Sequence, residues 1–145
     1  MTYPLHMSLQ GELAVTADGG EIELPASRKA RALLGYLAAT GRPIRRERLC
    51  ELFWDLPDDP RASLRWALSK IRKVVDRDGI RRIVADRERV TLALDDFYVE
   101  LRHIWVRLND DPPLIPASEL RDMAELFERP FLEGLENAGT EIFQN

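Results

Sequence analysis

Hydrophobic residues in the middle of the chain recur at the spacing of one helix face. Between residues 60 and 75 the apolar positions lie four, three and four residues apart, which predicts an apolar stripe along one side of a helix. Those positions are Leu64, Leu68, Ile71 and Val75. Asp59 is suited to the N-cap, and Pro60 to the first helical position, where a missing N–H costs nothing. We therefore predict a helix from Pro60 to Val75.

Two further helices are predicted before this one. Ser27 is a plausible N-cap for a helix that Gly41 ends, with Pro43 just beyond it. The inner side of this first helix would carry Ala30, Leu33, Leu34, Leu37 and Ala38. A shorter helix from about Arg45 to Phe53 would turn Leu49, Leu52 and Phe53 inward.

Alternating patterns and turn residues predict strands on both sides of the helices. Residues 8–16 alternate imperfectly and are followed by a glycine-rich turn and residues 21–24, which favours an antiparallel pair. Residues 80–85 and 90–94 flank the charged stretch 86–89, which predicts a hairpin with a charged tip. Strands, three helices and a final hairpin make an α+β winged helix-turn-helix.

The composition becomes acidic after residue 96. A helix from Phe97 to about Asn109, a linker at 110–113 and a helix over 118–127 are expected there. We therefore predict a winged-helix domain at 1–96 and a helical segment at 97–145.

The charge is unevenly distributed along the chain. The net charge is -4 and the pI is about 5.3, which alone argues against a nucleic-acid partner. Residues 28–89, however, hold 17 Lys and Arg against 9 Asp and Glu, and the remainder holds 4 against 16. A polyanion responds to charge within a Debye length of about 8–10 Å, so this local excess favours double-stranded DNA as partner.

The side of the 60–75 helix that faces away from the apolar stripe is the candidate DNA surface. Its candidate contacts are Arg61, Arg65, Trp66, Ser69, Lys70, Arg72 and Lys73. Lys70 and Trp66, one turn apart, are the first choices for base contact, and the others for phosphate contact. The alternatives are a solvated basic face and a Trp66 that packs on the preceding loop.

The predicted hairpin supplies a second set of basic side chains. Arg81, Arg82, Arg87 and Arg89 could reach the adjacent minor groove or the DNA backbone, as a wing does. An equally strong alternative is a hairpin whose arginines pair with Asp86 and Glu88.

The sequence shows no catalytic or metal-binding pattern, and we predict neither an enzyme nor a cofactor. His6 and His103 lie far apart, Cys50 is the only cysteine, and no glycine-rich phosphate loop occurs. No apolar run reaches the roughly 20 residues of a membrane span, and no secretory signal is readable, so we expect a cytoplasmic protein. The main rival function is a winged helix whose basic face binds an acidic protein.

Several motifs in sequence order resemble a known family. The stretches 28–37 (RKARALLGYL), 41–45 (GRPIR), 52–54 (LFW) and 59–72 (DPRASLRWALSKIR) resemble the OmpR-type winged helix of antibiotic-regulatory-protein (SARP) activators. Residues 97–135, with RPFLEGL at 129–135, resemble the start of the bacterial transcriptional activator domain that follows it in that family.

This resemblance implies an activator that binds promoters. It also implies that the loop before the third helix contacts RNA polymerase, here through Asp55, Asp58 and Asp59. A homodimer on direct repeats is expected from the resemblance alone. The family's activator domain is much longer than the segment that follows residue 97 here.

Overall fold

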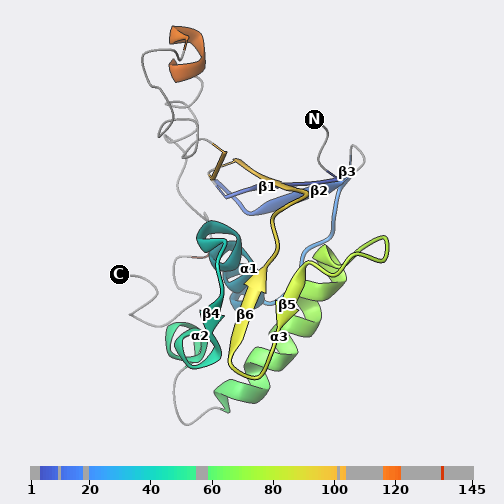
Figure 1. The fold of residues 1–145 in the computed structure, drawn as a ribbon, viewed down its shortest axis with the longest axis vertical. Coiled ribbons are helices and arrows are strands. Elements are labelled where there is room, and N and C mark those ends of the chain that lie inside the picture. The colour runs from blue at the N-terminus through green and yellow to red at the C-terminus, as the bar shows by residue number, and fades with distance from the viewer. Residues whose placement is uncertain are drawn as a thin grey trace.

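The computed structural model arranges three helices and two small sheets as a winged helix (Figure 1). It describes residues 4–9, 11–17, 20–54, 59–100, 102–103, 116–121 and 135. The elements are β1 (Leu5–Ser8), β2 (Ala14–Ala17), β3 (Gly20–Glu21), α1 (Arg28–Thr40), β4 (Ile44–Arg45), α2 (Arg46–Phe53), α3 (Pro60–Val75), β5 (Ile83–Ala85), β6 (Arg89–Leu92) and β7 (Phe97–Val99). The predicted fold class is confirmed.

Local capping interactions set the ends of the helices as the sequence predicts. The Ser27 hydroxyl accepts the Ala30 N–H at 3.2 Å and begins α1. The Asp59 carboxylate accepts the Ala62 N–H at 3.1 Å and begins α3, with Pro60 in its first turn. Gly41 ends α1 in the left-handed region at φ +60°, a conformation that glycine adopts without steric cost.

The first sheet has the strand order β3-β2-β1-β7. β1 and β2 are antiparallel, with His6 opposite Thr16, so the single strand predicted over residues 8–16 is wrong in its bounds. β7 runs parallel to β1, with Leu5 opposite Phe97. The predicted helix from Phe97 is therefore wrong over its first three residues, which complete this sheet, and helical conformation begins at Glu100.

Two of the described residues beyond β7, Arg102 and Leu135, contact the winged helix. Arg102 Nη1 donates to the carbonyl oxygens of Ala39 and Thr40, both at 3.1 Å, at the end of α1. A Cβ at Gly41 would lie 2.7 Å from Arg102 Cζ, so a larger residue there would displace this guanidinium from its present position. Leu135 is buried with the main core. The division after residue 96 stays a prediction, and these contacts join residues on its far side to the first domain.

The helix predicted over residues 118–127 is described only at its beginning. Residues 117–121 are helical, and the rest of that range lies outside the described residues, as does the linker at 110–113. Within the described ranges, no helix is long and apolar enough to cross a lipid bilayer.

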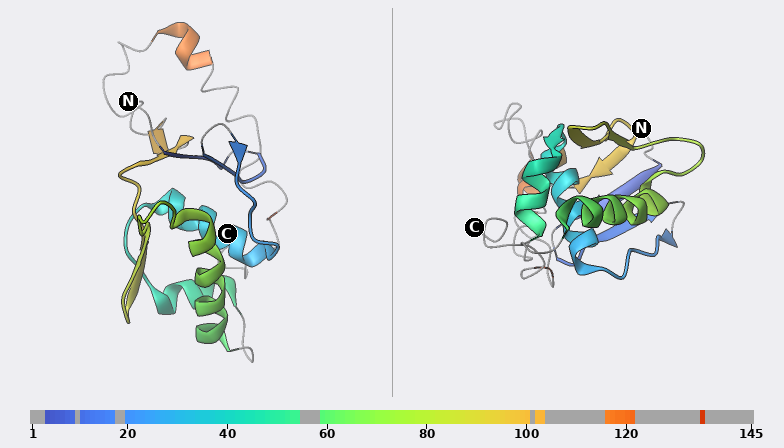
Figure 2. Two further views of the ribbon diagram at one scale, coloured as in Figure 1. Left: turned by 90° about the vertical axis from the view of Figure 1, so that its right-hand side faces the viewer. Right: turned by 90° about the horizontal axis from the view of Figure 1, so that it is seen from below.

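The second sheet, β4-β6-β5, forms the wing and packs on the helices (Figures 1 and 2). Its inner face is buried through Ile44, Ile83, Val90 and Leu92, and joins the same core as the apolar side of α3. The predicted hairpin is confirmed with shorter strands. The pairing of β4 with β6 was not predicted, because a two-residue strand before a helix has no periodic signal.

A buried arginine ties the wing to the end of α3 and to the segment before β7. The Arg82 side chain is 1% exposed and pairs with Asp96 through Nη2 at 2.7 Å and Nε at 3.0 Å. Its Nη1 donates to the Val75 carbonyl at 2.7 Å. The Asp76 carboxylate accepts the Arg82 and Ile83 N–H groups at 2.7 and 3.0 Å. The expectation that Arg82 contacts DNA is therefore wrong, because its side chain is buried and each of its three guanidinium nitrogens donates inside the protein.

The Arg82–Asp96 pair should make stability depend on pH. Hydrogen bonding to Arg82 lowers the pKa of Asp96 from its ordinary value. A depressed carboxyl pKa stabilises the fold above the unfolded value of about 3.9, and this stabilisation is lost as pH falls through the folded pKa. Asp96→Asn should cost on the order of 3 kcal/mol at pH 7, because it leaves a buried guanidinium without its counter-charge.

Urea unfolding of Asp96→Asn at several pH values tests this prediction. Wild type should lose more unfolding free energy than Asp96→Asn between pH 5 and 3. Asp95→Asn is the matched control, because Asp95 is exposed and outside the pair. If Asp96→Asn and Asp95→Asn lower the free energy of unfolding equally at pH 7, the structural role of Asp96 is contradicted.

Candidate nucleic-acid interface

α3 has one buried side and one open side. Its buried residues are Leu64, Ala67, Leu68, Ile71, Val74 and Val75, so the predicted apolar stripe is confirmed and extended by two positions. On the opposite side Trp66 is 52% exposed. A large aromatic side chain open to solvent beside basic residues marks a surface that is available to a partner.

Trp66 has one side-chain contact and one backbone contact with the next turn of α3. Lys70 Nζ lies 5.4 Å from the centre of the Trp66 ring, within the range of a cation–π interaction. The Ser69 hydroxyl donates to the Trp66 carbonyl at 2.6 Å, so its two acceptor lone pairs remain for a partner. The indole and this hydroxyl lie on adjacent turns of the open side.

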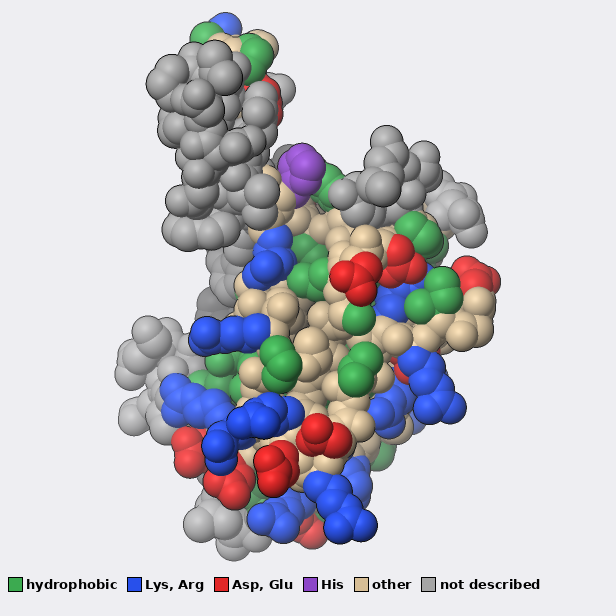
Figure 3. Space-filling model, in the orientation of Figure 1, with side chains coloured by type: hydrophobic (Ala, Val, Ile, Leu, Met, Phe, Trp, Pro, Cys, Tyr) green, Lys and Arg blue, Asp and Glu red, His purple; other side chains and the backbone are tan. Residues whose placement is uncertain are grey.

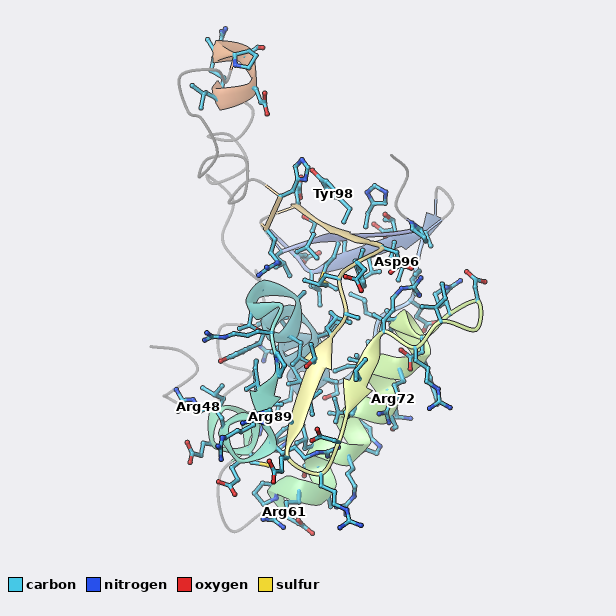
Figure 4. The ribbon with its side chains drawn as sticks, viewed as in Figure 1. Arg48, Arg61, Arg72, Arg89, Asp96 and Tyr98 are labelled. Atoms are coloured by element: carbon cyan, nitrogen blue, oxygen red, sulfur yellow. The ribbon has the colours of Figure 1, made fainter. Side chains whose placement is uncertain are left out.

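The flank of α3 nearer the wing forms one wall of a groove of about 1070 Å³, here called the wing groove. Its other walls are α2 and the turn between β5 and β6. The wing groove is lined by the basic residues Arg45, Arg46, Arg61, Arg65, Arg72 and Arg87 and by the acidic residues Glu47, Glu51, Asp59, Asp86 and Glu88. Of the predicted helix contacts, Arg61, Arg65 and Arg72 therefore lie together here, and Figure 4 shows Arg61 and Arg72 on α3.

The other flank of α3 faces the chain between β2 and α1. Lys70 and Lys73 line a smaller groove of about 570 Å³ with Arg77 and residues 20–25. Lys70 is half-buried, whereas Trp66 and Ser69 are exposed. The two flanks of α3 are thus both basic, and Trp66 and Ser69 lie between them.

The wing tip is fixed to α2 rather than free. The Asp86 carboxylate accepts the N–H groups of Glu88 and Arg89, both at 2.7 Å, and these bonds lower the pKa of Asp86. Arg46 Nε donates to the Asp86 carbonyl at 2.7 Å, and the Arg46 N–H donates to the Glu88 carbonyl at 2.8 Å. Arg87 is exposed at this tip, where a wing contact needs it.

The remaining wing candidates lie elsewhere. Arg89 is exposed on β6, and Figure 4 places it on the α2 side of the sheet. Arg81 is exposed but precedes β5, beside Arg72 and Asp76 at the base of the hairpin. Of the four predicted wing arginines, the structure brings only Arg87 and Arg89 near the tip.

Of the three aspartates expected to contact RNA polymerase, the structure describes one. Asp55 and Asp58 lie outside the described residues. Asp59 is exposed and caps α3, so any contact it makes must leave that hydrogen bond in place.

Sequence reasoning missed Arg45 and Arg46 as members of this surface. The sequence predicted both only as the beginning of the second helix, because the pairing of β4 with β6 was not foreseen. Cys50 also lines the wing groove, and burial raises the pKa of its thiol. Within the described ranges, no group of three His, Cys, Asp or Glu side chains is placed to hold a metal ion.

Comparison with known proteins supports the winged-helix fold. Neither protein-family models nor curated proteins give a significant match. Among solved structures, Mycobacterium tuberculosis EmbR in complex with a low affinity phosphopeptide is similar, with a TM-score of 0.56 and 26% sequence identity. The match covers 66% of this chain and 27% of the EmbR chain, so this protein matches only about a quarter of that structure. The likeness supports an OmpR/SARP-like winged helix.

The two sides of α3 should respond differently to truncation. Trp66→Ala should change the free energy of unfolding by less than about 1 kcal/mol, because its side chain is half open to solvent. Leu68→Ala should cost about 2–5 kcal/mol, because it leaves a cavity in the core. Urea unfolding measures both, and similar losses would show that the open side of α3 is structurally required.

Proposed function

We propose that this chain is the sequence-specific DNA-binding module of a cytoplasmic transcriptional regulator. The observation that carries the proposal is the open side of α3, where Trp66 and Ser69 lie between two basic flanks. A helix of this kind fits the major groove of DNA, which is about 12 Å wide and bordered by phosphates on both sides. The likeness to EmbR supports a DNA-binding regulator in general.

The described residues divide by role in this proposal. Trp66 and Lys70 are assigned to base edges, as the sequence predicts, because an aromatic ring can contact a thymine methyl and an ammonium can donate to guanine. Ser69, predicted as a phosphate contact, is reassigned to base edges because it is exposed beside Trp66 between the two flanks. Arg61, Arg65, Arg72 and Lys73 are assigned to phosphates, and Arg87 and Arg89 to the DNA beside the wing. Activation through RNA polymerase and a homodimer on direct repeats are parts of the proposal that come from the family resemblance.

One observation favours a second candidate function. The acidic residues in the wing groove alternate with its arginines, and such mixed charge suits a protein partner. In this alternative the winged helix is a protein-binding module. The salt dependence of binding distinguishes DNA binding from protein binding. The logarithm of the affinity for DNA falls with the logarithm of the salt concentration, with a slope of about 0.9 for each phosphate contacted.

Lys70→Ala should weaken binding to the preferred DNA site by about 1–3 kcal/mol and relax base choice at one position. The sites are first obtained by selection from a random pool, and affinity is then measured on the preferred site and its single-base variants. An equal loss on all sequences would assign Lys70 to a phosphate instead. That outcome would agree with its place on a flank of α3.

Arg72→Ala should weaken binding to all DNA sequences alike and reduce the salt slope by about 0.9. Arg72 Nε lies 4.0 Å from Asp76 Oδ2 and the Arg72 side chain is exposed. Loss of this surface ion pair should therefore leave the free energy of unfolding almost unchanged. Titrations on preferred and unrelated duplexes at several salt concentrations check this. A sequence-dependent loss, or an unchanged slope, would contradict the assignment.

A further inference from the structure

Two arginines oppose each other on the outer face of the wing sheet. Arg45 of β4 is the cross-strand partner of Arg89 of β6, and both are exposed. Directly opposite residues in an antiparallel pair have Cβ atoms about 4.5–5.5 Å apart, and like charges there destabilise the sheet. Among the described residues, no carboxylate lies within the 4.0 Å ion-pair distance of either guanidinium.

Two of the four nearby acidic groups are engaged in other contacts. Asp86 accepts two backbone N–H groups of the wing tip, and Glu51 pairs with Arg48 at 3.4 Å. Glu47 and Glu88 face the wing groove. In the free protein the like charges of Arg45 and Arg89 are therefore not offset by an ion pair with a described carboxylate.

The arginine pair is continuous with the proposed DNA surface. Arg45 also lines the wing groove, which it shares with Arg65 of α3 and Arg87 of the wing tip. In the space-filling view, Lys and Arg side chains gather over α2 and β4 (Figure 3). A duplex with α3 in its major groove carries closely spaced phosphates past the neighbouring protein surface.

We propose that Arg45 and Arg89 together bind a backbone phosphate of the DNA, beyond the contacts of α3. This inference rests on the proposed function and extends its site to β4. An Arg–phosphate contact can be bidentate, so two guanidinium groups would replace mutual repulsion with attraction to one phosphate. The pair thus reduces the stability of the free protein and strengthens its complex with DNA.

The test compares stability and DNA binding in the same variants. Arg45→Gln and Arg89→Gln should each raise the urea midpoint of the free protein at low salt by about 0.1–0.5 M. The double variant should gain little more than either single one, because the first change already removes the repulsion. The gain should vanish near 1 M salt, where the Debye length is about 3 Å.

Binding to a mixed-sequence duplex should change in the opposite direction. Each single variant should weaken affinity on the order of tenfold at low salt and reduce the salt slope by up to about 0.9. Arg45→Lys is the matched control, since it keeps the charge and should keep most of the slope. Arg45→Glu should be the most stable variant of Arg45 and the weakest binder.

Three outcomes would overturn the proposal. The first is a salt slope unchanged in Arg45→Gln and Arg89→Gln while Arg65→Gln reduces it. The second is a urea midpoint that neither variant raises at low salt. The third comes from a parallel titration with polyglutamate. If Arg45→Gln and Arg89→Gln lose affinity for polyglutamate but keep their affinity for the duplex, the pair binds an acidic protein instead. If wild type binds no DNA at all, the proposed function fails as well, so the two failures are distinguishable.

Discussion

Burial of one side of α3 is the constraint on which the rest of the structure depends. α3 packs against α1, α2 and β5, so its apolar side is shared by the helices and the wing. Fully burying a leucine or isoleucine contributes roughly 1.5–3 kcal/mol, and Leu64, Leu68 and Ile71 are all at most 2% exposed. Because this side is fixed inward, Trp66 and the basic flanks are left at the surface of the protein.

The arginines of residues 28–89 have different roles that their residue type does not reveal. Arg82 is buried because Asp96 and the Val75 carbonyl together satisfy its charge and its donors. Arg46 joins α2 to the wing tip through its side chain and its backbone. Arg65 and Arg87 make no such contact with the described residues and face the wing groove. A buried charge is tolerated only when it is paired and hydrogen-bonded, so the position of a carboxylate decides which arginine lies inside.

The segment after the wing packs against the winged helix. β7 adds a parallel strand to the first sheet, Arg102 caps the end of α1, and Leu135 enters the core. Asp96, which holds Arg82, lies just before β7. The wing, the end of α3 and the following segment therefore meet at one ion pair, and a change in any of them bears on the position of the proposed DNA surface.

Features with local causes could be predicted from the amino-acid sequence. The caps at Ser27 and Asp59, the end of α1 at Gly41 and the apolar side of α3 each depend on residues a few positions apart, so spacing and residue type were sufficient. The open side of α3 followed from the same periodicity, and with it the exposure of Trp66.

Features whose partners are distant in the chain became visible once the fold was known. Phe97–Val99 looked helical by pattern but forms a strand, because β1 offers unpaired backbone groups some ninety residues earlier. Arg82 looked like a wing contact until its pairing with Asp96 was known. The Arg45–Arg89 pair arises from the register of β4 and β6. Long-range pairing fixes which side chains meet, and one sequence carries no periodic signal for it.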